Sequence, residues 1–167
     1  MGRNSKVNYR ELDAFRKKVK SSLGSAQVDL FIESCAKELA ARLLAKVIKR
    51  TLPGQYPKGS GKVGGTLRRG WTAGKDQNAK TYAGNLNVNH YGGVYVIEIV
   101  NPVEYASYVE FGHRQTPGRY VPALGKRLKK GWVEGKFMLT ISEQEVQAAA
   151  PKILENKLKQ KLGEIFK

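Results

Sequence analysis

Residues 25–52 carry an apolar stripe at helical spacing, and a stripe of this length requires one long helix covered along one side. Its members recur at three- and four-residue steps: Val28, Phe31, Ile32, Cys35, Leu39, Leu43, Val47 and Ile48. Ser25 is predicted to cap this helix and Pro53-Gly54 to stop it. Because no second cysteine or nearby histidine offers metal-ligand spacing, we interpret Cys35 as a packed thiol rather than a nucleophile.

Two further helices are predicted near the ends of the chain. Residues 8–23 repeat apolar side chains at three- and four-residue steps up to Gly24, and their polar face is basic. Ser142 and Glu145 form a capping box that predicts a helix over residues 142–166, with a kink or restart at Pro151. The sequence leaves open whether this last helix packs on its own domain or on a neighbouring subunit.

The middle of the chain is predicted to form strands. Residues 66–73, 81–89 and 93–101 read as extended runs, joined before the third by a tight hairpin connection at residues 90–93. Residues 132–141 are expected to add an edge strand. The predicted fold class is therefore α+β: two N-terminal helices packed on a small antiparallel β-sheet, with a long loop and a C-terminal helix. One domain, residues 1–167, is expected to comprise N-terminal helices (8–52), a flexible loop (53–65), a sheet with an interface loop (66–141) and the C-terminal helix (142–166).

The loop of residues 53–65 contains a G-x-G-x-x-G pattern at residues 59–64. A dinucleotide-binding fold needs a strand before these glycines and a helix after them, and neither flanking segment has that character. A phosphate-binding P-loop is excluded as well, because Tyr56 replaces its first glycine and Val63 replaces the magnesium-binding Ser or Thr. We interpret the segment as a mobile basic loop.

Residues 103–124 combine aromatic, acidic, glycine and basic side chains in one short stretch. On a helix opened by Pro102 and closed by Gly112, Tyr105, Tyr108 and Phe111 would form an aromatic ridge beside Glu110. Pro117, Gly118 and Pro122 then predict an ordered surface loop. Aromatic and arginine side chains of this kind anchor protein interfaces, so Tyr105, Tyr108, Glu110 and Phe111 are predicted subunit-interface residues. The alternative is that the tyrosines cap a small core.

Two blocks of this sequence resemble motifs of a known family. Residues 105–114 (YASYVEFGHR) and 118–124 (GRYVPAL) are similar to the signature "YA-x-x-V-E-F-G-[TH]" and "P-x-[FY]-[ILV]-x-P-A-L" of the tail-component family of tailed bacteriophages. Residues 65–71 (GTLRRGW) resemble that family's "T-G-x-L-R-x-S-[IW]" segment, with Gly70 where a serine is common. The order of parts covers nearly the whole chain. The resemblance implies a small neck or tail-completion component without catalytic activity.

The chain is strongly basic, with 30 Lys and Arg against 14 Asp and Glu and a net charge of +16. Residues 112–141 hold seven basic side chains and one acidic side chain, whereas residues 75–111 hold two basic and four acidic ones. Such an excess favours a polyanion or an acidic protein surface as neighbour. The predicted contact residues for an acidic partner or passing DNA are Lys62, Arg68, Arg69, Arg114, Arg119, Lys126 and Arg127; the sequence does not decide between these two partners.

Little in the sequence indicates chemistry. The histidines, His90 in a turn and His113 in the basic loop, have no nucleophile or second carboxylate at a suitable spacing, so we expect no enzyme, cofactor or metal site. A single cysteine suits a reducing cytoplasm, and no apolar run reaches the roughly 20 residues of a membrane span. We expect no membrane contact and no secretion signal.

These observations, together with the resemblance, predict a structural protein of a phage or phage-like contractile tail. The resemblance implies a homo-oligomeric ring, with six subunits expected, at the neck between the tail and the head-side connector. It would contact adjoining neck, connector and tail proteins in the virion, after assembly in the host cytoplasm. A tail terminator ring is the nearest alternative, and a non-specific nucleic-acid-binding protein is the more distant one.

Overall fold

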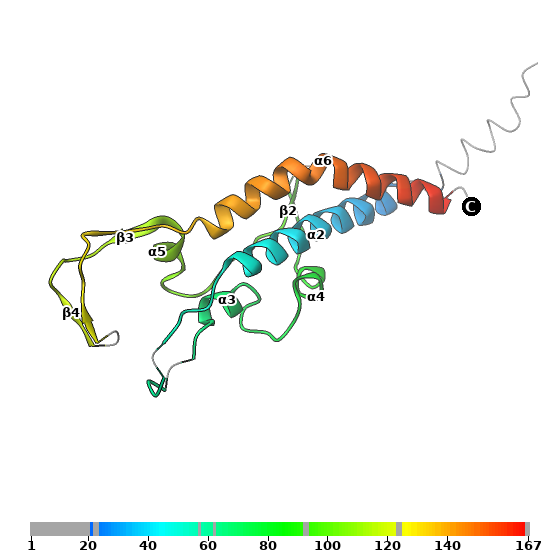
Figure 1. The fold of residues 1–167 in the computed structure, drawn as a ribbon. Coiled ribbons are helices and arrows are strands. Elements are labelled where there is room, and N and C mark those ends of the chain that lie inside the picture. The colour runs from blue at the N-terminus through cyan, green and yellow to red at the C-terminus, as the bar shows by residue number, and fades with distance from the viewer. Residues whose placement is uncertain are drawn as a thin grey trace, which may run out of the picture.

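Two long antiparallel helices form the main axis of the molecule (Figure 1). The structure is a computed structural model, and it describes residues 21, 24–56, 58–61, 63–91, 94–122 and 125–165. The helices are α2 (Ser25–Arg50) and α6 (Met138–Ile165), and they pack side by side. The helix predicted over residues 8–23 lies almost entirely outside the described residues.

Helix α2 confirms the predicted long helix, but its buried side differs in detail. Cys35 and Val47 of the predicted stripe are buried, as expected. Ala40 and Leu44 are buried too, whereas Leu43 stays half-buried. The stripe is displaced because α2 is covered from two directions, by α4 and by α6, rather than by one sheet.

The ends of α2 also differ from the prediction. Gly24 occupies the N-cap position, and no side chain caps the helix there, so the prediction of a Ser25 cap is wrong. At the other end Thr51 takes the C-cap position, and its amide and its hydroxyl both donate to the Val47 carbonyl. The helix therefore ends at Arg50, shortly before Pro53-Gly54.

The first two predicted strands are wrong, because both segments contain short helices. Helix α3 (Thr66–Gly70) and helix α4 (Ala79–Gly84) replace them. In α3 the buried side chains Leu67 and Trp71 are four residues apart, which is helical rather than strand spacing. In α4 the Asn78 side chain accepts from the Thr81 amide at 2.9 Å and caps the helix.

In the described residues the strands form three separate two-stranded ribbons and not the predicted single sheet under the long helix. Strand β1 (Asn89–Tyr91) pairs antiparallel with β2 (Val94–Val96), which confirms a hairpin at this place, although His90 and Tyr91 belong to the strand. Strand β3 (Gly112–Arg114) pairs with β6 (Trp132–Glu134), and β4 (Tyr120–Val121) pairs with β5 (Lys126–Arg127).

Residues 112–134 form one two-stranded extension, which we call the hairpin arm. Its inner part pairs β3 with β6, and its outer part pairs β4 with β5 in a register shifted by one residue. Backbone bonds from Gln115 to Gly131 and from Gly118 to Leu128 connect the two parts. The arm leads away from the helix pair in Figure 1. The predicted loop is therefore an arm with a bulge near Pro117, and the strand predicted over 132–141 ends at Glu134.

Helix α6 begins at Met138, four residues before the predicted capping box. Ser142 is fully buried inside the helix, where its hydroxyl donates to the Met138 carbonyl at 2.6 Å. Glu145 reaches across to α2, so neither residue acts as predicted. Helix α6 continues past Pro151 to Ile165.

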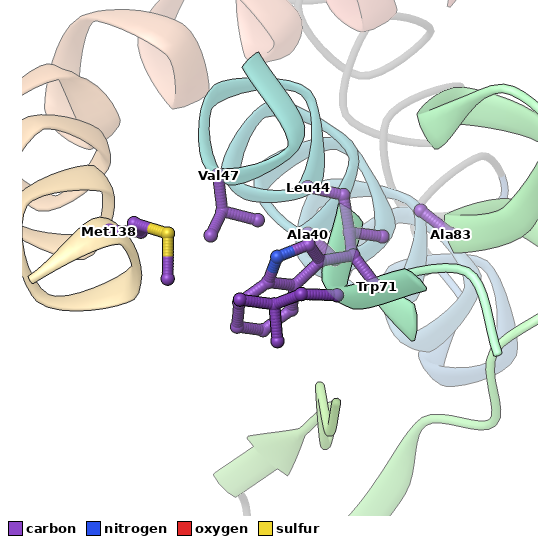
Figure 2. Packing of buried hydrophobic residues seen from close by; sticks show 7 residues of the cluster. Ala40, Leu44, Val47, Trp71, Ala83 and Met138 are labelled. Atoms are coloured by element: carbon purple, nitrogen blue, oxygen red, sulfur yellow. The ribbon is translucent and has the colours of Figure 1, made fainter. Parts of the chain in front are cut away.

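The core lies where α2 meets α3, α4 and the start of α6 (Figure 2). Leu44 and Val47 of α2 are completely buried, and Trp71 packs against them with only 4% of its surface exposed. The Trp71 indole N–H donates to the Thr51 hydroxyl at 2.8 Å, so its polar atom is paired. The fold class is α+β, as predicted. No helix in the described part of the chain combines the length and apolarity needed to cross a membrane.

Candidate interface formed by α5 and the hairpin arm

Helix α5 (Ala106–Phe111) carries the predicted aromatic ridge of Tyr105, Tyr108 and Phe111. It starts later than the predicted Pro102 and ends before Gly112, as predicted. Tyr105, Tyr108 and Phe111 are 43%, 57% and 61% exposed. The alternative that the tyrosines merely cap a core does not describe Tyr108, which is exposed and whose ring makes an edge-to-face contact with the His113 ring, with centroids 5.8 Å apart.

Glu110, placed with the ridge by the sequence, points the other way. Its side chain is buried, at 6% exposure, and its carboxylate accepts three hydrogen bonds from the first turn of α6. The donors are the Leu139 amide at 3.0 Å, the Thr140 amide at 2.9 Å and the Thr140 hydroxyl at 2.8 Å. Glu110 thus caps a helix more than 25 residues downstream, where a negative charge also suits the helix dipole. The geometry gives it a role within the chain.

The backbone of α5 is held equally closely to the segment before α6. The Lys136 amide donates to the Val109 carbonyl at 2.8 Å, and the Phe137 amide donates to the Glu110 carbonyl at 3.0 Å. Phe137 adopts the left-handed region at φ 47° and is 43% exposed. A bulky residue in this conformation is strained, and these two flanking hydrogen bonds hold it in place.

Two glycines permit this close approach. A Cβ atom on Gly112 would lie 2.5 Å from the Val133 carbonyl oxygen, and one on Gly135 would lie 2.3 Å from the Glu110 carbonyl oxygen. Gly112 also has φ 84° and ψ 172°, a region open essentially to glycine alone. The glycine of the VEFG block is therefore required where α5 turns into the arm.

The arm adds side chains that sequence reasoning did not select. Trp132 lies opposite Arg114 in the β3–β6 pair and is 49% exposed, and Tyr120 in β4 is also exposed. The sequence placed Trp132 only in an edge strand. Trp132 follows two lysines and a glycine in the sequence, and such a pattern does not tell whether a tryptophan is buried or exposed.

The predicted basic residues fall on two different elements. Arg114, Arg119, Lys126 and Arg127 lie on the arm and are exposed. One of them, Arg127, donates to the Gly118 carbonyl at 2.8 Å and so links the arm's two strands.

Arg68 and Arg69 instead lie on α3 and are exposed there. The Arg69 guanidinium donates to the Gly64 carbonyl at 3.2 Å. Lys62 lies outside the described residues. Four of the predicted basic residues therefore lie together on the arm, whereas Arg68 and Arg69 lie apart from them on α3.

The two motif blocks meet at the base of α5. Tyr105 and Val109 line a hollow of about 260 Å³ together with Leu67 and the segment of residues 52–56. The Asn101 side chain donates to the Leu67 carbonyl at 2.9 Å, and a Cβ atom on Gly70 would lie 2.2 Å from the Asn101 side-chain oxygen. Gly70, where the family resemblance expects a serine, therefore fits this particular contact with Asn101.

The titratable groups form no recognisable reaction centre in the described residues. Burial raises the pKa of the Cys35 thiol, with a smaller opposing effect from Lys157, which fits a packed and unreactive side chain. Within residues 24–165, as far as they are described, no group of three or more His, Cys, Asp or Glu side chains could hold a metal ion.

The structure thus places an exposed aromatic ridge, held from inside by the Glu110 carboxylate, next to a projecting basic arm. Exposed aromatic and arginine side chains of this kind are typical of protein interfaces. The chain belongs to the family described as "Bacteriophage HK97-gp10, putative tail-component", whose model matches residues 13–112. The family resemblance seen in the sequence is thereby confirmed. Membership gives the chain a structural role in the phage tail, a place in the virion and other tail proteins as its neighbours. No curated protein and no solved structure matches it.

The match covers residues 65–71 and the segment from Tyr105 to Gly112, where it ends, and it does not include residues 118–124. The hairpin arm beyond Gly112 therefore lies outside the matched segment. The aromatic ridge and its supporting glycine belong to the family part of the chain, while the exposed basic side chains of the arm are carried by the part that follows.

Proposed function

We propose that this protein is a ring-forming component of the phage neck, which completes the tail and joins it to the head. Family membership supports a tail role, and the outward direction of Tyr105, Tyr108 and Phe111 supports a contact surface. The observation that carries the proposal is the contrast within α5, where Glu110 fixes the helix from inside and the aromatic side chains are left outside. Six subunits are the expected number.

A closed ring requires a heterologous contact, in which one surface of each subunit meets a different surface of the next. The aromatic ridge provides one such surface. The arm residues Arg114, Arg119, Lys126 and Arg127 provide charge for a second contact, with carboxylates of a neighbour or with DNA. Arg68 and Arg69 on α3, with Lys62, are proposed to face the same kinds of partner from a separate position.

The ridge is tested by replacing Tyr108 and Phe111 with alanine. Both side chains are more than half exposed, so we expect an unchanged fold, loss of the oligomer in solution and loss of infectious particles on complementation. Tyr91→Ala is the matched control, because Tyr91 is 65% exposed but lies in β1. A double variant that assembles fully and supports infection contradicts the proposed surface.

Deletion of the gene separates the proposed neck role from its alternatives. Unjoined heads and tails in electron micrographs are the expected result. Overlong tails would instead assign the chain to the tail terminator, the adjoining ring. Normal particles that lack this protein would contradict a structural role in the virion.

A further inference from the structure

The charge of this chain is segregated along the sequence in a way that suggests a partner for the arm. Between Lys80 and Arg114 there is no lysine or arginine, although the chain contains 30 of them. Residues 114–130 of the arm, by contrast, contain six basic and no acidic residues. A segment without basic residues is therefore followed directly by a segment without acidic residues.

The segment without basic residues includes residues 96–104, which we call the acidic strip; it leads from the end of β2 to the turn before α5, and every second residue from Val96 to Glu104 is exposed. Its side chains alternate. Ile97 and Ile99 pack against the core, while Val96, Glu98 and Val100 point outward and are exposed. The Tyr95 hydroxyl donates to Asp29 of α2, which fixes the start of this strip on the long helix. The outward face is therefore apolar with a carboxylate at its centre.

Only the middle of the strip lacks backbone partners among the described residues, because Val96 pairs with Asn89 and the Val103 amide donates to the Asn101 side chain. Strand β2 ends at Val96 because its partner β1 begins at Asn89, where the chain has just left α4. Among the described residues, Ile97 to Val100 form no backbone hydrogen bond. A segment with open backbone groups and exposed apolar side chains, here Val96 and Val100, is a site that another chain can contact.

Four charged side chains on the two surfaces lack partners within the described part of the chain, whereas Arg127 is bonded to the Gly118 carbonyl within the arm. Glu98 and Glu104 form no ion pair or side-chain hydrogen bond there, and neither do Arg119 and Lys126 on the outer arm. The outer arm stands away from the helix pair, whereas β2 lies behind that pair (Figure 1). The outer arm therefore lies apart from β2 of its own subunit, where the strip begins.

We propose that the hairpin arm of one copy docks on the acidic strip of the next copy. This pairing rests on the ring proposed above and identifies the carboxylate-bearing surface that the arm meets. Arginine next to Tyr120 and Trp132 forms the kind of surface that anchors protein contacts, and exposed apolar side chains on both sides exclude water around the charge pairs. A phosphate backbone would use the basic side chains but would leave the exposed aromatic and valine side chains uncovered. A second copy of the chain would both pair the basic side chains and cover the apolar ones.

Charge reversal tests this pairing. The arm variant carries Arg119→Glu and Lys126→Glu, and the strip variant carries Glu98→Lys and Glu104→Lys. Because these four side chains have no partner within the described chain, the folds should be unchanged. Each variant alone should self-associate at least about tenfold more weakly in sedimentation, because like charges then face each other. An equimolar mixture, and a chain carrying all four changes, should associate nearly as well as the wild type.

A control variant with Lys80→Glu and Lys152→Glu has the same net charge as the arm variant but leaves both surfaces intact. It should associate like the wild type.

Unchanged association of the arm and strip variants overturns this pairing and leaves the ring proposal standing, as does weakening without recovery in the mixture. Salt-dependent binding to duplex DNA that only the arm variant loses, with unchanged self-association, would assign the arm to DNA instead. A wild-type chain that stays monomeric contradicts the pairing, while the deletion phenotype still tests the neck role separately.

Discussion

Glu110 shows how a residue in a contact motif can serve the fold. It lies between two exposed aromatic positions, Tyr108 and Phe111, and yet its carboxylate is buried against the first turn of α6. It accepts hydrogen bonds from two backbone amides that a helix start leaves open and from the Thr140 hydroxyl, and its negative charge suits the helix dipole. The ridge is thereby held at a fixed position relative to α6, and a partner would meet a rigid surface.

Replacing Glu110 with alanine should therefore destabilise the isolated protein. Three donors at a partly buried helix start would lose their acceptor, and we expect a loss of about 2–4 kcal/mol in the free energy of unfolding. Urea unfolding of Glu110→Ala and Glu110→Gln measures this, and the glutamine variant should lose less because its carbonyl oxygen still accepts.

Glu104→Ala is the matched control, since Glu104 is exposed and has no partner in the described chain. Its change should stay within about 0.5 kcal/mol. Equal stability of the Glu104 and Glu110 variants would show that the buried carboxylate does not support α6.

At the scale of elements, an ionic clamp fastens α2 to α6. The Lys46 ammonium donates to Glu145 at 2.7 Å, and the Arg50 guanidinium bonds to the same carboxylate and to the Ser142 hydroxyl at 3.2 Å. Lys46, and secondarily Arg50, hold the pKa of Glu145 below its ordinary value of 4.5. Because the group is partly exposed, solvent screens this interaction.

The clamp predicts a pH dependence. A carboxyl with a lowered pKa in the folded state contributes stability that is present above pH 4.5 and is lost as the pH falls through the lowered value. The difference in unfolding free energy between the wild type and Glu145→Gln should therefore shrink as the pH is taken from about 6 to about 3. Denaturant unfolding at several pH values checks this. A difference that stays constant across the range would show that the clamp has no electrostatic part.

At the scale of the whole molecule, two electrostatic effects oppose each other during assembly. A net charge of +16 makes copies of the chain repel each other. At separations beyond about 10 Å this repulsion is already screened by salt near 0.1 M. A local pairing of basic arm and acidic strip acts at contact and needs higher salt to weaken it. Association and repulsion therefore respond to different salt ranges.

Self-association should accordingly pass through a maximum with salt. We expect it to strengthen from about 0.01 to about 0.1 M salt, as the long-range repulsion is screened, and to weaken at about 1 M, where the contact pairs are screened as well. Sedimentation velocity over this range measures the effect. Association that only strengthens up to the highest salt would indicate an interface held by apolar contacts alone.

Local patterns in the sequence determined those features that depend on neighbouring residues. The long helix ends shortly before Pro53-Gly54, α5 ends at Gly112, and β1 and β2 form a hairpin, because stop signals, helix spacing and turn residues act within a few positions. The two motif blocks also indicated the family, which the match to residues 13–112 confirms.

Tertiary structure decided which side of each element is buried and which short segments become helices. Residues 66–73 and 81–89 had the composition of strands, but packing against α2 selects the helical spacing of Leu67 with Trp71 and of α4. Likewise Glu110 points inward only because the start of α6, far along the chain, offers donors there. A sequence pattern specifies the spacing of apolar side chains along an element. Which element covers each face depends on residues that are distant in the chain.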